Sequence, residues 1–191
     1  MSSRDTDKYP TARTFAEMLC GLRFGVWWLA LVFVSSLSLA DERQLETRVK
    51  SAFIYNFTKY LSWPDDSMRD SLHICVARDT SVYEVMRETL TSKESQGRRV
   101  EVRLLRSGQE VSSCDVVYLP RNHPVADWKF ELQAPGIVTV GEGSEFASDY
   151  GVFGFVVVAE KIRFDINLGL ARQKGVRISS KLLSLAQRVV E

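Results

Sequence analysis

The chain has 191 residues, of which 45% are hydrophobic and 26% are charged, with 25 Lys and Arg against 24 Asp and Glu. A length of this order fits one ordinary domain, and the apolar fraction excludes a disordered chain. The balanced charge removes the electrostatic case for nucleic-acid binding, which requires a local excess of Lys and Arg.

Residues 1–40 are predicted to be a cleaved secretory signal peptide. Phe24–Leu39 is an uncharged run preceded by a basic residue, and Ser38 and Ala40 supply small side chains before a cleavage site. A membrane anchor is the alternative, but a spanning helix needs about 20 apolar residues and this run becomes polar through its serines. Met18 is a second candidate for the true start, because the stretch before it is unusually long and hydrophilic.

The remaining residues, 41–191, are predicted to form a single domain without net charge. Its first element is an amphipathic helix over Glu42–Leu61, with apolar side chains such as Leu45 and Val49 recurring every three to four residues. Strands and helices then alternate. The predicted order is strand Ser71–Ala77, helix Ser81–Thr91, strand Val100–Leu104, strand Asp115–Leu119, a helix with Val125, Trp128 and Leu132 on one face, and strand Ile137–Val140.

The alternation of strands and helices ends in the last part of the chain. Strands Val152–Ala159 and Lys161–Ile166 follow each other too closely for a crossover helix, so they should pair antiparallel. A brief helix, Leu168–Lys174, is closed by Gly175, and a C-terminal helix is expected to start at Ser179 or Ser180 and to bury Leu182, Leu183, Ala186 and Val189 or Val190. The sequence therefore predicts an α/β fold: a three-layer sandwich with a mostly parallel sheet, an antiparallel hairpin near its C-terminal edge, and flanking helices.

The sequence contains little that indicates catalysis. His73 lies inside a predicted strand, where a structural role is favoured, and His123 has no Cys or carboxylate at metal-ligand spacing. Nucleophile elbows, P-loops and zinc-protease motifs are missing from the sequence. Gly141–Gly143 follows a strand but matches only half of a dinucleotide turn, since Phe146 stands where the third glycine belongs. We therefore expect a non-enzyme with no catalytic residue, no metal site and no cofactor.

Two of the three cysteines, Cys75 and Cys114, lie in the predicted domain. In an exported protein such a pair predicts a disulfide, whereas in a reducing cytosol it would more often be two small buried hydrophobic residues. The bridge is geometrically possible if the two strands that carry the cysteines are neighbours. A purely structural cross-link is favoured over a redox switch, and both readings stay open.

A second notable segment is the polar series along the strand that contains Arg163, Asp165 and Asn167. Strand alternation places these three side chains on one face, and either a solvated edge or a binding face explains them. Phe153, Phe155 and Val157 share one side of the preceding strand, as core or as an exposed docking patch. The partner-binding residues predicted from this segment and its surroundings are Phe153, Phe155, Arg163, Asp165, Asn167 and Arg172.

From Val49 to its C-terminus the chain resembles the YfiR family. The resemblance is carried by the helix VKSAFIYNFTKYLSWP, the strand LHICVA, the segment CDVVYLP and the block from RFDINL to SSKLLSLA. It implies a periplasmic repressor that binds the periplasmic sensor domain of an inner-membrane diguanylate cyclase and lowers cyclic-di-GMP. It further implies release of the cyclase by an OmpA-like outer-membrane lipoprotein, and self-association as a homodimer.

The resemblance also places the family's first disulfide on Cys75 and Cys114. The second disulfide of well-known members has no counterpart, because Phe146–Phe155 contains no cysteine, and Tyr150-Gly151 stands where those members have two glycines. The main alternative function is a periplasmic sensor that binds a small molecule near Gly141–Gly143, where a helix N-terminus could receive an anion. A hydrolase is the least favoured reading. The sequence names neither the partner cyclase nor the stimulus.

Overall fold

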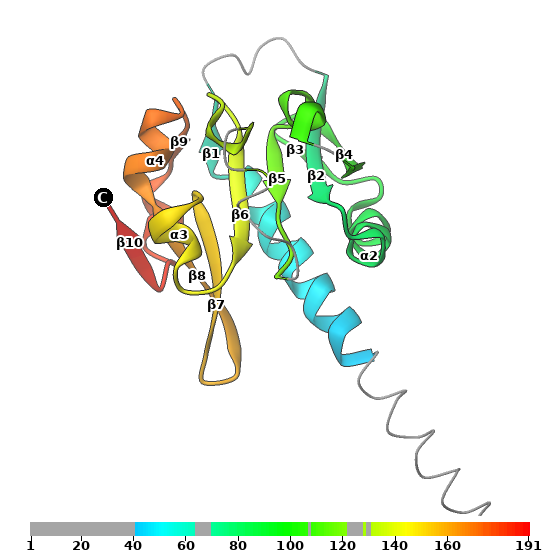
Figure 1. Ribbon diagram of the computed structural model, residues 1–191, viewed down its shortest axis with the longest axis horizontal. Helices are drawn as coiled ribbons and strands as arrows, with labels where there is room; N and C mark the ends of the chain where they lie inside the picture. The colour runs from blue at the N-terminus through cyan, green and yellow to red at the C-terminus, as the bar shows by residue number, and fades with distance from the viewer. Residues whose placement is uncertain (1–40, 64–69, 107, 122–127, 129–130) are drawn as a thin grey trace, which may run out of the picture. The chain divides into compact units, whose positions relative to one another are not determined.

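The computed structural model describes residues 41–63, 70–106, 108–121, 128 and 131–191 (Figure 1). Gln44–Glu191 form one compact unit, and Met1–Arg43 are grouped apart from it. The predicted signal peptide, residues 1–40, and the second candidate start at Met18 lie outside the described residues. The fold below is that of the compact unit.

An eight-stranded mixed sheet forms the middle of the unit (Figure 1). Five of its seven strand pairs are parallel, and the antiparallel ones are β7–β8 and β3–β4. A separate antiparallel pair joins β1 (Leu61–Ser62) to β9 (Arg177–Ile178). The order across the large sheet is β10 (Arg188–Val190), β8 (Lys161–Asn167), β7 (Phe153–Val158), β6 (Val138–Glu142), β5 (Val116–Tyr118), β2 (Ser71–Ala77), β4 (Arg98–Leu105) and β3 (Glu94–Ser95).

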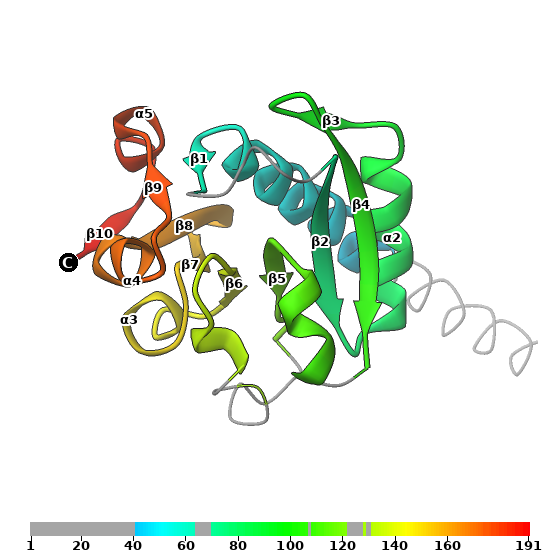
Figure 2. The ribbon, with the colours of Figure 1, turned by 90° about the horizontal axis from the view of Figure 1, so that it is seen from above.

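Both faces of this sheet are covered (Figure 2). The N-terminal helix, described over residues 41–58, and α2 (Thr80–Leu90) pack on one face, together with side chains such as Ile74 and Val76 of β2. The intervening Cys75 points to the opposite face. That second core is closed by η2 (Gly108–Ser113), η4 (Glu131–Gln133) and α3 (Phe146–Asp149). The predicted α/β sandwich with a mostly parallel sheet and a hairpin near its C-terminal edge is confirmed.

The prediction of a C-terminal helix is correct only for its first turn. Helix α5 covers only Ser180–Leu183, and the chain then continues as β10, parallel to β8. The N–H of Gln187 donates to the carbonyl of Phe164, which starts this pairing. Val189 and Val190 are β-branched and fit an extended strand better than a helix, whereas α4 (Leu168–Gln173), followed by Gly175 at φ +76°, agrees with the prediction.

The N-terminal helix is shorter than predicted, because residues after 58 turn into β1. Its end is covered by the β3–β4 turn, in which Gln96 and Gly97 both have positive φ. The Gln96 amide donates to the carbonyls of Thr58 and Leu61 at 2.6 and 2.7 Å, and so satisfies carbonyls that the helix leaves open. The predicted helix around Trp128 lies largely outside the described residues, apart from Trp128 and η4.

Candidate functional site

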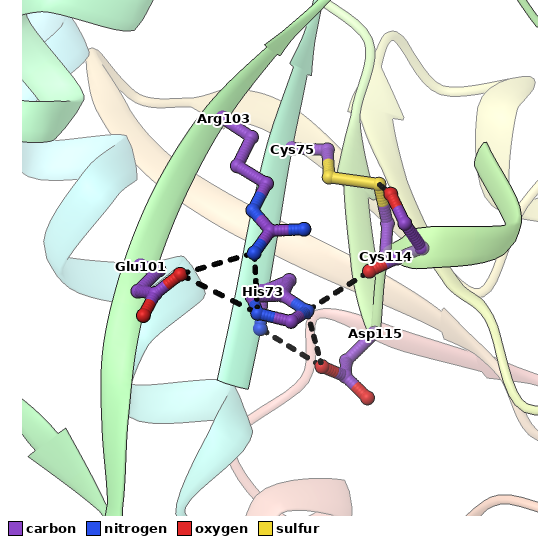
Figure 3. Close-up of a disulfide and its surroundings, with 7 residues drawn as sticks. His73, Cys75, Glu101, Arg103, Cys114 and Asp115 are labelled. Atoms are coloured by element: carbon purple, nitrogen blue, oxygen red, sulfur yellow. Dashed lines mark hydrogen bonds and ion pairs between the residues drawn. A yellow bond between two sulfur atoms is a disulfide. The ribbon is translucent and has the colours of Figure 1, made fainter. Parts of the chain in front are cut away.

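Cys75 and Cys114 form a disulfide, as expected for an exported chain, and their Cα atoms lie 6.0 Å apart (Figure 3). Cys75 is in the middle of β2, and Cys114 lies two residues before β5, the strand next to β2. Both are buried in the second core, beside Val117 of β5 and Leu119, which follows that strand. The bridge therefore holds the connection that leaves η2 against the sheet, from a position that water hardly reaches.

A polar network surrounds the disulfide at the start of the strands (Figure 3). His73, two residues before Cys75, has its Nδ1 2.9 Å from the carbonyl oxygen of Ser113. Its backbone N–H donates to Oδ2 of Asp115 at 2.8 Å. The residues on either side of Cys114 are thus both bonded to His73, and the histidine has the structural surroundings that its place in a strand predicted.

The network continues onto β4. Nε2 of His73 lies 2.8 Å from Nη2 of Arg103, and the same guanidinium donates to Oε2 of Glu101 at 3.1 Å. Ser71 donates to the other Glu101 oxygen at 2.9 Å. The hydrogen bond from Ser71, followed by that from Arg103, lowers the pKa of the Glu101 carboxyl. The carboxylate therefore stays ionised and anchors Arg103.

A second cluster lies where β5 and β6 end. The Glu142 carboxylate accepts a 2.5 Å hydrogen bond from Tyr118 and pairs with Lys50 at 2.8 Å, and Lys50 also pairs with Glu46 at 2.5 Å. Burial, followed by the charge of Glu142, raises the pKa of the Tyr118 hydroxyl well above its usual range. Since Lys50 and Glu46 belong to the N-terminal helix, the cluster fastens that helix to the carboxyl ends of the strands.

This cluster bears on the expected small-molecule site at Gly141–Gly143. The carboxylate within that segment is already engaged by Lys50 and Tyr118. Gly141 serves packing, because a Cβ there would come within 2.2 Å of the Phe146 ring. The helix that follows, α3, has only four residues, too short to offer an anion site. The segment is therefore explained by internal contacts.

The predicted partner-binding phenylalanines are core residues. Phe153 and Phe155 are 0% and 3% exposed, so their reading as an exposed docking patch is wrong. The ring of Phe153 stacks on that of Phe57 of the N-terminal helix at 4.4 Å, and Phe155 contacts Phe53 at 6.0 Å. Their side of the strand was predicted correctly, but the helix that covers it comes from the other end of the chain.

The polar side chains of Asp165 and Asn167 on β8 make contacts inside the domain. Asp165 is buried and pairs with Arg188 of β10 at 2.8 Å. Asn167 accepts from the N–H of Leu170, which caps α4, and donates to the carbonyl of Ala147 in α3, both at 2.7 Å. Asp165 is buried and therefore not on an accessible binding face, whereas Asn167 is half-buried and its part in partner binding stays a prediction. The other two predicted residues of this surface, Arg163 and Arg172, are exposed.

The family model described as YfiR/HmsC-like matches residues 47–187. The chain belongs to the YfiR/HmsC-like family. The family is periplasmic and regulatory, so membership supports a periplasmic regulator of cyclic-di-GMP signalling in general terms. No helix in the described ranges has the length and hydropathy that crossing a bilayer requires.

Among curated proteins the YfiR/HmsC-like chain has no match. Among solved structures it is similar to an ABC domain from Streptococcus pneumoniae in complex with L-Trp, at 15% identity and a TM-score of 0.48, over 71% of this chain and 59% of that one. It is also similar to a conserved domain protein from Vibrio cholerae, at 12% identity and a TM-score of 0.49, over 73% and 59%. The chain thus spans about 59% of the length of each, and likenesses at this level carry no functional argument.

The exposed apolar groups of this YfiR/HmsC-like domain were predicted only in part, because the side of β7 that carries Val157 was left open between core and an exposed patch. Val157 and Val158, near the tip of the β7–β8 hairpin, are 60% and 41% exposed, and Leu45 on the N-terminal helix is 62% exposed. Figure 1 shows that the hairpin and the helix both reach beyond the rest of the sheet. Leu45 was placed on a buried face because helical periodicity identifies a face but not the point at which the sheet beneath it ends.

Proposed function

We propose that the protein is a repressor that binds the periplasmic sensor domain of an inner-membrane diguanylate cyclase and holds cyclic-di-GMP synthesis down. The observation that carries the proposal is the family match over residues 47–187. A repressor of this kind needs no catalytic group. It needs a rigid surface that binds one state of its partner better than the other. A disulfide-bonded, two-core domain supports that requirement.

The contact surface that we propose is the hairpin tip, residues 156–163. Val157 lies on the same side of β7 as Phe155, whose ring contacts that of Phe53 in the N-terminal helix. The apolar stripe of the core therefore continues outward onto Val157. Arg163, exposed and directly opposite Val156, adds a positive charge on the other face of the same hairpin.

The available energy is adequate for repression. Moving a two-state partner from 1:99 to 99:1 takes about 5.5 kcal/mol of differential binding free energy. Burying an exposed valine or leucine fully contributes about 1.5–3 kcal/mol, so two or three such side chains with one charged hydrogen bond reach that value. The buried residues Phe153, Phe155 and Asp165 contribute by holding the hairpin in place, and Arg163 is the charged group at the tip. Arg172 lies in α4, at the opposite end of β8 from the tip.

The cellular test is deletion followed by complementation. Deletion is expected to raise cyclic-di-GMP, and the wild-type gene should restore the low level. Val157→Asp combined with Arg163→Glu should fail to restore it while accumulating normally in the periplasm. Leu185→Asp is the matched control, because Leu185 is 57% exposed but lies in the bend before β10. Unchanged cyclic-di-GMP on deletion contradicts the proposed function. Full repression by the double variant contradicts the proposed surface.

Two further partners belong to the proposal. An OmpA-like outer-membrane lipoprotein captures the repressor and so releases the cyclase, and the repressor itself associates as a homodimer. Light scattering on the purified mature chain tests the dimer directly. A competition assay, with lipoprotein added to a preformed repressor–sensor complex, tests the capture: release of the sensor domain supports it, and an undisturbed complex contradicts it.

A further inference from the structure

The surroundings of His73 define the protonation state of its ring. A guanidinium offers only donors, so Nε2 of His73, 2.8 Å from Nη2 of Arg103, must accept and carries no proton. The carbonyl oxygen of Ser113 offers only an acceptor, so Nδ1 at 2.9 Å must donate. The ring shown in Figure 3 is therefore the neutral Nδ1–H tautomer.

Charged groups face this ring from both neighbouring strands. Glu101 and Arg103 lie on β4, with Oε2 of Glu101 3.5 Å from Nε2. Asp115, before β5, has its Oδ2 4.0 Å from Nδ1 and is approached by Arg98 at 4.0 Å. A proton on the ring adds one positive charge to this group of two carboxylates and two guanidinium groups.

We propose that His73 is an acid-sensitive latch: when neutral it accepts a hydrogen bond from Arg103 at the edge of the sheet, and when protonated it loses that bond and leaves Arg103 held by Glu101 alone. A protonated Nε2 can only donate, so its contact with Nη2 of Arg103 becomes one between two cations at 2.8 Å. Its nearest carboxylate is Glu101 at 3.5 Å. The protonated ring moves toward Glu101, and the hydrogen bond from Arg103 to Nε2 of His73 is lost.

Loss of the hydrogen bond to His73 affects a side chain that solvent reaches. The Arg103 side chain is 42% exposed on β4, where only residues 98 and 99 pair with β3. Histidine is the side chain that ordinarily changes charge between pH 5 and 8, a range that a periplasmic protein meets. Acidification thus adds one charge and leaves the Arg103 guanidinium with Glu101 alone at the same strand edge. This device is separate from the hairpin tip and holds whether or not the hairpin binds a cyclase.

NMR on the isotope-labelled mature chain tests the latch. His123 is the other histidine of the chain, so His123→Gln leaves a single imidazole to follow. At pH 8 the ring nitrogens should show the Nδ1–H tautomer. Between pH 8 and 5 the Arg103 Nε–Hε signal should move with the same midpoint as the ring. An Nε2–H tautomer, a ring that does not titrate, or an Arg103 signal that stays fixed while the ring titrates overturns the proposal.

Two variants complete the test. In His73→Gln, which can still accept from Arg103 but does not titrate, the Arg103 signal should stay fixed; the wild-type titration in this variant would assign the effect to Glu101 or Asp115 and refute the latch. In Arg103→Gln the ring loses the cation at Nε2, so its midpoint should move to higher pH. An unchanged midpoint contradicts the coupling. This second variant keeps the proposal testable even if His73→Gln does not fold.

Discussion

Removal of the disulfide should cost the domain a large part of its stability. Replacing both cysteines in Cys75→Ala/Cys114→Ala opens a loop whose ends are 39 residues apart in the sequence. The chain-entropy relation for a loop of that size predicts a loss of about 4 kcal/mol in the free energy of unfolding. A domain of about 150 residues loses roughly 2–4 °C in Tm per kcal/mol, so the double variant should melt roughly 8–16 °C below the oxidised wild type.

Calorimetry of the oxidised wild type and the double variant measures this difference. The wild type reduced under denaturing conditions and then refolded is the matched control, because it keeps both sulfur atoms without the bond. It should melt close to the double variant. Since both cysteines are buried, reductant added to the native protein should react only as fast as the domain opens. A double variant within about 2 °C of the wild type, or rapid native-state reduction, would refute the reasoning.

Three further predictions concern packing, charge and pH. Gly151→Ala would bring a Cβ within 2.0 Å of the Phe146 ring, so the free energy of unfolding measured in urea should fall by about 1–3 kcal/mol; an equally stable variant contradicts this packing. Arg188→Ala leaves the buried Asp165 without its cation and should lower the free energy of unfolding by about 3 kcal/mol. This value is near the lower end of such losses because the Arg188 side chain is 49% exposed. Adding Asp165→Ala should recover part of the lost stability. Burial lowers the pKa of Lys174 from 10.5 to about 8. The unfolded chain therefore holds a proton that the folded one releases, and stability relative to Lys174→Met should rise between about pH 8 and 10.5, whereas a constant difference contradicts it.

Local patterns in the sequence were enough to predict most of the sheet. β2 was predicted with the bounds that the structure has, because its apolar run is short and bounded by polar residues. The antiparallel pairing of β7 and β8 followed from the short connection between them. The C-terminal strand β10 was not predictable in the same way, since its extended form depends on pairing with β8 rather than on its own periodicity.

The site was predicted only in part, for a related reason. The disulfide could be anticipated because only two cysteines lie beyond the predicted leader. The network around His73 could not, because its partners come from two segments distant from it in the sequence, Arg103 from β4 and Ser113 and Asp115 from either side of Cys114. Alternation assigned Phe153 to a face correctly, but whether that face is covered depends on the docking of the distant Phe57.

Titration of the purified mature chain into the periplasmic sensor domain of an inner-membrane diguanylate cyclase from the same cell tests the regulatory role most directly. The account predicts saturable binding for the wild type and Leu185→Asp, and a loss of affinity of at least tenfold, about 1.4 kcal/mol, for Val157→Asp. Absence of binding to every such sensor domain in the cell would contradict the account.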